Sequence, residues 1–599
     1  MDSPQNRYSE NIKSCTQVLY RVERRIYRVG SIRLLTAVSA IVLSLIFKHE
    51  EWSIIIGIVV VHLMLFLWLL KISNKLSYKK EYIRHLLKIN KDELAGLNYD
   101  YSAFDGYPER IDVQHPFTFD LDIFGEKSVF QSINRTQTAF GKNRLADWFE
   151  NPLTDKIKIS ERNEAVKELL TQPDFCQHFA AVGKMHPGNL SDVEKLKKFA
   201  FAKDFITGKC WKIVSWVLPI SWLAGFISAG FGVVGYSQIL LFFFVCLGLS
   251  YCMTKKINGL RKTIGNNVNV LSTYSSLLKI VEEHAFSSEI LQRTGQKLFG
   301  ASTRASSEIK KLSDYLHAIE LGRTFPGGLL LNVFFLWEIK YARAIERLKN
   351  EHKHNIGTWF EVLGIFDAFC SLGIFAFNRP QFIFPEISDD YFCYRAKNMG
   401  HLLLRDEVCV KNDLDIRQSP HFLIVTGANM AGKSTYLRTV GLNLLLGCMG
   451  MPVYAEEMCF YPARPVCSLR TSDSLVNNES YFFAELKRLS GMIERLKNGE
   501  KLFIILDEIL KGTNSLDKQK GSLALVKQFL SLKSYGIIAT HDLELGKLEE
   551  TFPQEIRNIC FEADIRDNNL YFTYKARPGM VQNMNACFLM KQIGIDVDE

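Results

Sequence analysis

The chain lacks the features of a protein stapled by disulfides or zinc. Its 13 cysteines are scattered from Cys15 to Cys587, and no two of them form a Cys-x-x-Cys pair. This spacing argues against a structural zinc site and a disulfide framework, so reduced thiols in the cytosol are expected. No cleavable signal peptide is expected either, because the basic stretch before the first apolar run, about 30 residues, is too long for one.

Charge is missing from four long stretches of the chain. None of them contains a Lys, Arg, Asp or Glu: residues 34–47, 52–70, 213–231 and 236–253. The hydrocarbon core of a bilayer is crossed by about 20 apolar helical residues. The last three stretches reach or approach that length, and the first does so when it is extended back to Ser31. Short loops join the stretches in pairs, which predicts two transmembrane helical hairpins; the alternative is a set of buried core helices.

Lysines and arginines cluster just before and just after each predicted hairpin, whereas the loops inside the hairpins are poor in them. The positive-inside rule then places both chain termini in the cytoplasm. The expected location is the inner (cytoplasmic) membrane, crossed several times. The net charge of +9 fits a nucleic acid or an anionic membrane surface as partner and is specific for neither.

A phosphate-binding pattern lies in the last third of the chain. Gly427-Ala-Asn-Met-Ala-Gly-Lys-Ser434 fits G-x-x-x-x-G-K-[ST], between an apolar run at 421–426 that reads as a strand and a helical pattern at 436–446. A strand, a glycine-rich turn and a helix N-terminus aim backbone N–H groups at an anion. This predicts an ATP and Mg²⁺ site in which Lys433 reaches the phosphates and Ser434 binds the metal.

Two further apolar runs end in polar residues that suit such a site. Residues 501–506 precede Asp507 and Glu508, and residues 534–539 are followed closely by His541. Asp507 would hold Mg²⁺, Glu508 would act as general base, and the histidine would sense the γ-phosphate or orient water. Taken alone, an acidic pair of this kind is more often a helix cap or a solvated loop, and such a histidine a surface residue. The preceding phosphate loop favours the functional interpretation.

The order of these segments suits an ATP-binding-cassette type of ATPase core. A polar loop at 512–517 would lie beside the nucleotide. Cores of this type usually hold ATP between two copies, each of which supplies a signature loop to the other copy's nucleotide. A homodimer formed through the ATPase domains is therefore expected.

At this point a family resemblance becomes specific. Residues 426–438, with their Asn-Met pair and Ser-Thr-Tyr-Leu-Arg continuation, resemble the phosphate loop of the MutS mismatch-repair ATPases. Four later segments resemble the family's signature helix, its Asp-Glu-Ile-x-x-Gly-Thr motif, its Ala-Thr-His motif and its late strand: residues 480–486, 507–513, 539–545 and 571–579. Upstream, residues 122–153 and 159–170 are similar to the start of the family's core and lever region. The likeness covers roughly residues 120–200 and 360–595.

The resemblance implies a set of site residues. The phosphate- and metal-binding residues would be Gly427, Asn429, Gly432, Lys433, Ser434 and Thr435. Asp507 would bind the metal, and with Glu508 it would serve hydrolysis. His541 would be the switch histidine, and Ser480 would start the signature helix that acts on the partner copy's nucleotide.

The expected fold is an α/β C-terminal ABC-type P-loop ATPase domain plus an all-α core and lever region that carries two transmembrane helical hairpins. The expected divisions are a basic N-terminal segment, hairpin 1, a connector, a helical core with hairpin 2 at 211–254, and the ATPase domain: residues 1–30, 31–71, 72–119, 120–380 and 381–599. Helices are expected at 271–283, 306–321 and 329–348. The apolar run 329–337 is too short to span a bilayer, so core packing is expected for it.

The chain departs from the family in its DNA-reading parts. No counterpart of the N-terminal domain that wedges a Phe into the duplex is found, because residues 1–120 hold a hairpin and a polar connector. No counterpart of the connector domain or of the DNA clamp is found, and hairpin 2, which is inserted in the lever region, is a candidate to take the place of the clamp. Cys409 stands where the family often has an aromatic residue against adenine.

Two functions of different classes remain open. The first is a membrane-anchored, MutS-like ATPase that binds double-stranded DNA, with ATP hydrolysis coupled to lever and clamp movement in DNA repair or recombination. The second is a membrane-acting ABC-type ATPase motor whose levers drive the transmembrane hairpins without DNA. A nucleotide-gated scaffold without turnover is disfavoured by the intact Asp507-Glu508 pair.

Overall fold

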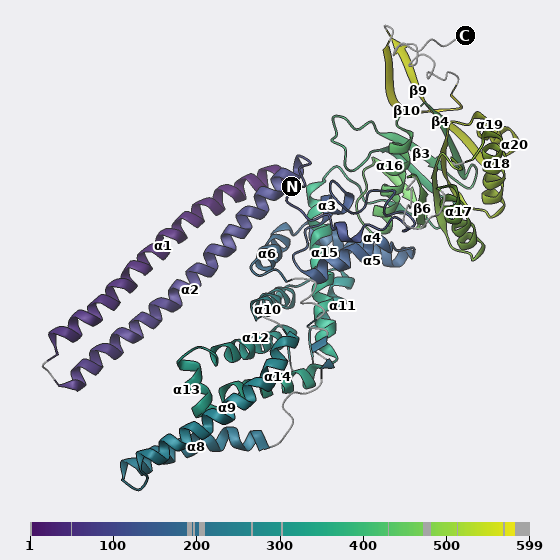
Figure 1. Ribbon diagram of the computed structural model, residues 1–599. Coiled ribbons are helices and arrows are strands. Elements are labelled where there is room, and N and C mark those ends of the chain that lie inside the picture. Colours follow the sequence, from purple (N-terminus) through teal and green to yellow (C-terminus); the bar gives the residue numbers. More distant parts are fainter. Residues whose placement is uncertain are drawn as a thin grey trace.

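The computed structural model describes most of the chain, in twelve segments: residues 3–48, 51–188, 195, 198–199, 201–202, 210–264, 268–300, 303–428, 430–470, 481–511, 513–566 and 569–581. A mixed α/β part lies at one end of an elongated molecule, a helical body lies beside it, and two helical hairpins project toward the same side (Figure 1).

The first hairpin pairs α1 (Pro4–Ile46) with α2 (Trp52–Leu97). Ser3 caps α1 by accepting a hydrogen bond from the Asn6 N–H, and Pro4 occupies the first turn, where its missing N–H costs nothing. The proximal halves are polar outside and joined by a small apolar seam that contains Val22 and Ile83. Both helices therefore continue well past the predicted hairpin, through the expected N-terminal segment and most of the connector.

The distal half of this hairpin is apolar and exposed. Exposed large apolar side chains are spread over both helices, among them Leu34, Leu35, Val38, Ile41, Leu45, Ile46, Trp52, Ile56, Val61, Leu63, Met64, Leu67 and Trp68. At 1.5 Å per residue, an apolar stretch like residues 52–70 is about 30 Å long, which matches the hydrocarbon thickness of a bilayer. Water is a poor environment for such a surface.

The helical body surrounds α15 (Asn355–Asn378), which is almost completely buried. Around it lie α3 (Val129–Ile133), α4 (Ala139–Glu150), α5 (Lys156–Leu170), α6 (Pro173–Gly183), α10 (Val268–Glu283) and α11 (Glu289–Gln296), preceded by a short 3-10 turn, η1 (Pro108–Arg110). Ser128, Thr138 and Asp155 cap α3, α4 and α5 with side-chain oxygens.

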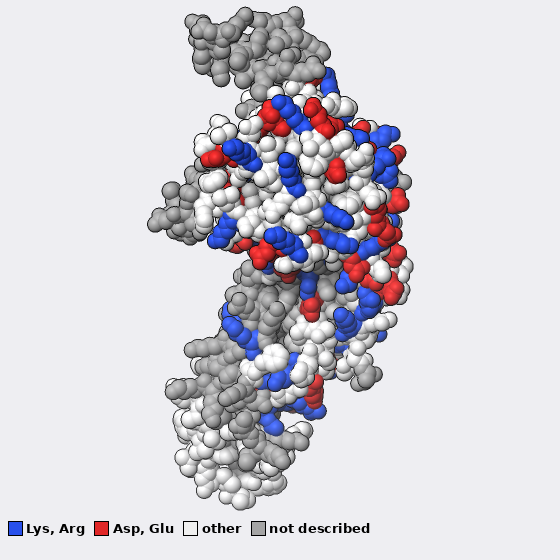
Figure 2. All heavy atoms as spheres, turned by 90° about the vertical axis from the view of Figure 1, so that its right-hand side faces the viewer, with Lys and Arg blue, Asp and Glu red and all other residues white. Residues whose placement is uncertain are grey.

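The second hairpin, α8 (Cys210–Gly230) and α9 (Tyr236–Ile264), projects from the far end of the body beside α12 (Ala305–Leu321), α13 (Gly327–Phe335) and α14 (Trp337–His352). The expected single helix at 329–348 is wrong, because Leu336 adopts a φ of 46° and separates α13 from α14. Among the coloured residues of Figure 2, those at the lower end of the molecule are mostly white, whereas blue and red are mixed over its middle.

Only one face of α13 is packed into the protein core, although core packing is expected for the whole apolar run 329–337. Val333 is buried, and its carbonyl oxygen accepts a hydrogen bond from the Trp222 Nε1–H of α8 at 3.2 Å. The Phe334 ring lies 4.6 Å from that of Trp222. Leu330 and Phe335 on the other face are 46% and 48% exposed. The expectation that this run is part of the core is therefore wrong for Leu329, Leu330 and Phe335, because α13 covers hairpin 2 without being covered itself.

Four helices of the described residues are long and apolar enough to cross a membrane: α1, α2, residues 213–230 of α8, and α15. The apolar part of α9, residues 236–252, is somewhat shorter. The apolar 18-residue segments of α1, α2 and α8 are 6%, 6% and 11% buried, whereas the corresponding segment of α15 is 89% buried. Helix α15 thus buries its apolar surface inside the protein, whereas α1, α2 and α8 leave theirs exposed.

The C-terminal part contains two sheets. The smaller has the strand order β1-β5-β2-β3 and is formed by β1 (Glu386–Ile387), β2 (Tyr394–Met399), β3 (Asn412–Ile416) and β5 (Glu457–Phe460). The larger has the order β10-β9-β4-β8-β7-β6 and is formed by β4 (Phe422–Gly427), β6 (Arg464–Ser468), β7 (Leu502–Asp507), β8 (Tyr535–Thr540), β9 (Ile556–Arg566) and β10 (Asn569–Pro578).

The larger sheet is covered by helices and is parallel from β9 to β6. Its helices are α16 (Lys433–Cys448), α17 (Tyr481–Lys497), α18 (Ser515–Ser531), α19 (Leu543–Gly546) and α20 (Leu548–Thr551). β4, β7 and β8 consist of buried, largely β-branched or large apolar residues, as expected for strands covered on both faces. In a parallel sheet the carboxyl ends of these strands meet at one edge.

A buried polar network joins hairpin 1 to the body. The Arg135 Nε–H donates to Glu93 Oε1 on α2 at 2.6 Å, and both side chains are less than 10% exposed. The other oxygen of Glu93 accepts from Asn378 Nδ2 at 2.8 Å, and the Asn378 carbonyl oxygen accepts from the Tyr8 hydroxyl on α1 at 2.6 Å. The base of the hairpin is therefore fixed to the end of α15.

We expect Arg135→Ala to destabilise the protein by about 3 kcal/mol, because it leaves Glu93 buried without its cationic partner. Lys279→Ala is a matched control, since it removes one member of the exposed Lys279–Glu283 pair and should change stability by less than about 0.5 kcal/mol. Thermal unfolding of the detergent-purified protein measures both. Equal melting temperatures for the two variants would show that the buried pair contributes little.

Candidate functional site

The turn between β4 and α16 is shaped by two glycines. Gly427 and Gly432 have φ angles of 149° and 99°, in the region that side chains with a Cβ rarely adopt. A Cβ on Gly427 would lie 2.4 Å from the Phe561 backbone oxygen. The turn leads straight into the N-terminus of α16, whose first N–H groups have no partner within the helix. The local sequence therefore builds an anion-binding concavity.

Lys433 lies buried under this turn. Its Nζ donates to the carbonyl oxygens of Gly427 and Ala428 at 2.8 and 3.0 Å, and it lies 3.3 Å from His541 Nε2. Burial lowers the pKa of Lys433, while the charges of Asp507 and Glu508 act in the opposite direction. The ammonium group is held by groups from the ends of β4 and β8, close to the charges of the acidic pair at the end of β7.

Asp507 is the last residue of β7 and faces α16. The Ser434 hydroxyl donates to Asp507 Oδ2 at 2.5 Å. Burial raises the pKa of Asp507, and the hydrogen bond from Ser434 partly offsets this effect. A hydroxyl and a carboxylate oxygen in contact are ligand types that Mg²⁺ prefers.

Glu508 is held in an unusual backbone conformation with a φ of 49°. Its N–H donates to the Ala539 oxygen of β8 at 2.9 Å, which fixes the residue between the two strands. One carboxylate oxygen lies 2.6 Å from His541 Nε2, and the other lies 3.3 Å from Lys511 Nζ. The hydrogen bond with His541 is the main reason that the pKa of Glu508 falls to about 2. The carboxylate is therefore ionised at neutral pH.

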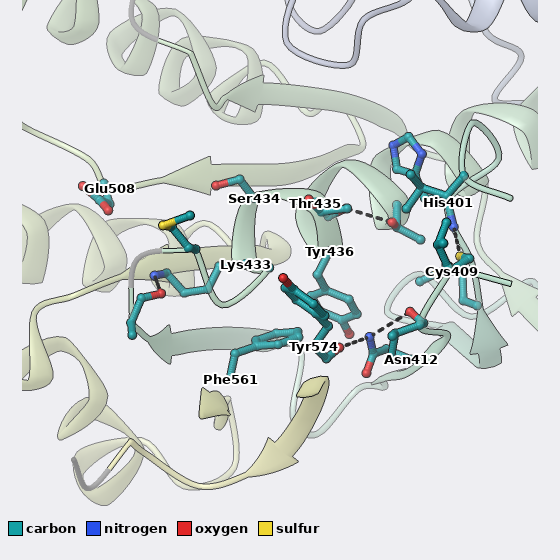
Figure 3. Close-up of a pocket in the computed structure, with 18 residues that line it drawn as sticks. His401, Cys409, Asn412, Lys433, Ser434, Thr435, Tyr436, Glu508, Phe561 and Tyr574 are labelled. Atoms are coloured by element: carbon teal, nitrogen blue, oxygen red, sulfur yellow. Dashed lines mark hydrogen bonds between the residues drawn. The ribbon is translucent and has the colours of Figure 1, made fainter. Parts of the chain in front are cut away.

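A pocket of about 350 Å³ adjoins this polar end (Figure 3). Its lining includes the sequence-predicted Gly432, Lys433, Ser434, Thr435 and Glu508, and away from the acidic end it is lined mainly by apolar and aromatic residues: Met399, Leu404, Val408, Val410, Tyr436, Phe561 and Tyr574. One end of the pocket suits phosphate and the other suits a flat apolar ring. Cys409 lines the pocket, and its sulfur accepts from the His401 N–H at 3.4 Å.

Tyr574 and Phe561 were missed as site residues. Both come from the β9–β10 pair, and Asn412 fixes β10 against β3 by donating to the Tyr574 oxygen at 2.9 Å and accepting from the Ala576 N–H at 2.8 Å. The only sequence signal was the resemblance of residues 571–579 to a late strand of the family, which assigned no role to the tyrosine. Long-range pairing decides which aromatic side chain reaches the pocket.

Most predicted site residues come together, and two cannot be placed. Lys433, Ser434, Asp507, Glu508 and His541 share one edge of the sheet. Asn429 and Ser480 lie outside the described residues. The signature helix is represented by α17, whose Glu485 Oε1 accepts from the Leu510 N–H at 2.7 Å and so contacts the loop that follows Glu508.

Comparisons with known proteins agree with this architecture. The family model described as MutS domain III matches residues 118–372, and the one described as MutS domain V matches residues 423–595. The first range covers the helical body with hairpin 2, and the second contains the glycine-rich turn, the acidic pair and His541.

Curated relatives point the same way. MutS protein homolog 4 of Homo sapiens is 28% identical over 245 residues, which cover 39% of this chain and 25% of that protein. DNA mismatch repair protein MSH4 of Arabidopsis thaliana is 30% identical over 194 residues, 31% of this chain and 23% of that protein. DNA mismatch repair protein MutS of Thermotoga sp. (strain RQ2) is 25% identical over 515 residues, 78% of this chain and 61% of that protein. The chain therefore spans between 23% and 61% of the length of these relatives.

We expect Gly427→Ala to destabilise the protein by about 1–3 kcal/mol, because the new Cβ meets the Phe561 oxygen and the backbone angle is strained. Gly491→Ala in α17 is the control: nothing lies within 4 Å of its Cβ position, and alanine in a helix should be neutral or stabilising by up to about 1 kcal/mol. Thermal unfolding of the two variants tests the geometry of the turn without any ligand. A Gly427→Ala protein as stable as the wild type would contradict it.

Proposed function

The chain belongs to the MutS family, and on that premise we propose that it is a Mg²⁺-dependent ATPase whose nucleotide site is the pocket between β4, α16 and β7. The carrying observation is the convergence of Lys433, the Asp507-Glu508 pair and His541 beside a glycine turn that opens a helix. The triphosphate would lie over the turn and the α16 N-terminus, and the base would lie against the apolar end near Tyr574.

The residues present fit a bound magnesium ion. Ser434 and Asp507 supply oxygen ligands from the two sides of the site, 2.5 Å apart. Magnesium bound there would supply charge neutralisation of the phosphate oxygens. The Lys433 ammonium donates to the carbonyl oxygens of the turn in the structure, and it could donate a charge-assisted hydrogen bond to a phosphate oxygen instead.

Glu508 would accept the proton of the attacking water. It is ionised, since its pKa is about 2, and it is anchored by His541 on one side and Lys511 on the other. Those contacts fix the carboxylate in a single orientation, and a fixed base lowers the entropic cost of reaction. His541 contacts Lys433 as well as Glu508, so movement of Lys433 toward a bound phosphate would be passed to Glu508 through the histidine side chain.

The proposed active form is a homodimer in which each copy completes the other's site. Support comes from α17, which begins at Tyr481, directly after the signature residue Ser480, and which contacts the Glu508 loop through Glu485. A partner's signature helix placed over the nucleotide would couple dimer closure to hydrolysis.

We propose double-stranded DNA as the partner of this ATPase, in mismatch repair or recombination. The support is the family and the names of the relatives, among them DNA mismatch repair protein MutS. ATP-driven lever movement would reach the DNA through the helical body. The apolar, exposed ends of both hairpins support anchoring in the inner (cytoplasmic) membrane with the ATPase domain in the cytoplasm.

One observation favours the second candidate, a motor that acts on the hairpins without DNA. Residues 404 and 408–410 line the nucleotide pocket, and in the same loop Arg405 donates to the Asn98 oxygen at the end of α2 at 3.4 Å. Arg379, directly after α15, donates to the Tyr101 hydroxyl and stacks over Tyr99. One hydrogen bond, donated by Arg405, thus joins the pocket loop to the end of α2.

Glu508→Gln should retain ATP binding and lose turnover by about 10²- to 10⁴-fold, because the amide cannot accept the proton. Lys433→Ala should lose ATP binding itself. Lys520→Ala, an exposed change on α18, should leave both unchanged. Nucleotide binding and phosphate release by the detergent-purified protein measure these effects. Wild-type turnover in Glu508→Gln would remove Glu508 as the base.

Duplex binding at several salt concentrations separates the two candidates. A DNA-binding protein that neutralises several phosphates should lose affinity with a log–log salt slope of several units. Binding no tighter than that of a neutral control protein would leave the motor function as the better proposal. An alkaline wash of membranes tests the anchor independently, since release of the protein would show that the hairpins are not integral.

A further inference from the structure

A basic cleft lies at the foot of hairpin 2, where α8 leaves the helical body. It has a volume of about 430 Å³ and is bounded by α8, α12 and α14. Its polar and aromatic lining comes from Ser215, Trp216, Tyr315 and the charged residues Glu308, Lys311, Lys340, Arg343, Arg347 and Glu351. With four basic and two acidic side chains, the lining carries a net charge of about +2 at neutral pH.

Three of the basic residues share one face of α14. Lys340, Arg343 and Arg347 are spaced by three and four residues, so their side chains project to the same side. Like charges at this spacing oppose helix stability unless counter-charges relieve them. Arg347 is paired with Glu351 at 2.8 Å, and Lys311 with Glu308 at 2.8 Å. In the described part of the chain, no carboxylate lies within 4 Å of Lys340 or Arg343.

The cleft lies where the polar surface gives way to an apolar one. Trp216 at its edge is 72% exposed. Beyond it, the exposed side chains of α8 are apolar as far as the tip of the hairpin: Val217, Ile220, Leu223, Phe226 and Ile227. Figure 1 shows α14 beside this foot and the hairpin running away from the body. An exposed tryptophan between basic and apolar surface is typical of the membrane–water interface.

We propose that this cleft binds the phosphate headgroup of an anionic phospholipid, with Lys340 and Arg343 as the principal contacts and the acyl chains lying along α8. The proposal rests on the membrane insertion proposed above. The basic lining favours an anionic ligand. The adjoining apolar face of α8 favours a lipid, because a free phosphate or a nucleic acid has no acyl chains to cover that face. The site would fix the depth of hairpin 2 at the cytoplasmic leaflet.

Native mass spectrometry of the full-length protein in detergent tests this site. The probes are phosphatidylglycerol and phosphatidylcholine with the same acyl chains. The wild type should prefer phosphatidylglycerol, and Lys340→Gln/Arg343→Gln should weaken that preference about fivefold for each basic side chain removed. The charge-keeping pair Lys340→Arg/Arg343→Lys should restore it. Lys310→Gln is the control, because Lys310 is exposed on α12, pairs with Asp314 and does not line the cleft.

An unchanged preference in the double glutamine variant would overturn the proposal. Displacement of the lipid by excess inorganic phosphate alone would also overturn it, because it would indicate a simple anion site. A double glutamine variant that loses duplex DNA binding but keeps the lipid preference would overturn it as well. Alkaline extraction of membranes carrying the same variants separates this inference from its premise. Release of the wild-type protein overturns both, whereas retention without any headgroup preference overturns only the lipid site.

Discussion

Three adjacent parallel strands set the position of every polar group in the candidate site. β4, β8 and β7 pair in register, so Gly427, Thr540 and Asp507 end at the same sheet edge. The side chains that follow these strand ends are then brought within hydrogen-bonding distance of one another, although more than a hundred residues separate Lys433 from His541. Slippage of one strand by a single residue would turn its side chains to the opposite face and separate the acidic pair from the lysine.

The charges at this edge are balanced against each other. Lys433 is buried and needs the acidic pair, and Glu508 is kept ionised by His541 and Lys511. Asp507 is held by a neutral hydroxyl, and burial raises its pKa. The two adjacent carboxylates therefore have different environments, because Asp507 lies beside a neutral hydroxyl and Glu508 lies between two basic side chains. Neighbouring groups whose pKa values are pushed apart are a frequent mark of functional sites.

A second set of polar contacts joins the helical body to hairpin 1. Helix α15 is the buried central helix of the body. Its last residue, Asn378, contacts both helices of hairpin 1 through Tyr8 and Glu93. The next residue, Arg379, contacts the loop after α2. A polar, fully bonded joint of this kind is directional, whereas apolar packing can slide. It gives α15 and hairpin 1 a defined relative orientation.

The sequence alone determined those features that depend on residues close together in the chain. The glycine turn, the strands that end in Asp507 and near His541, and the apolar hairpin stretches could each be read from spacing and composition. Tertiary structure decided what depends on partners: that Tyr574 lines the pocket, that Leu336 breaks a predicted helix, and that α13 is covered on one face only. The contrast between α15 and the hairpins gives the physical reason. Helices α1, α2, α8 and α15 are all apolar enough to cross a membrane. Hydropathy depends only on the residues of the helix itself, whereas burial depends on which surfaces the fold brings against it.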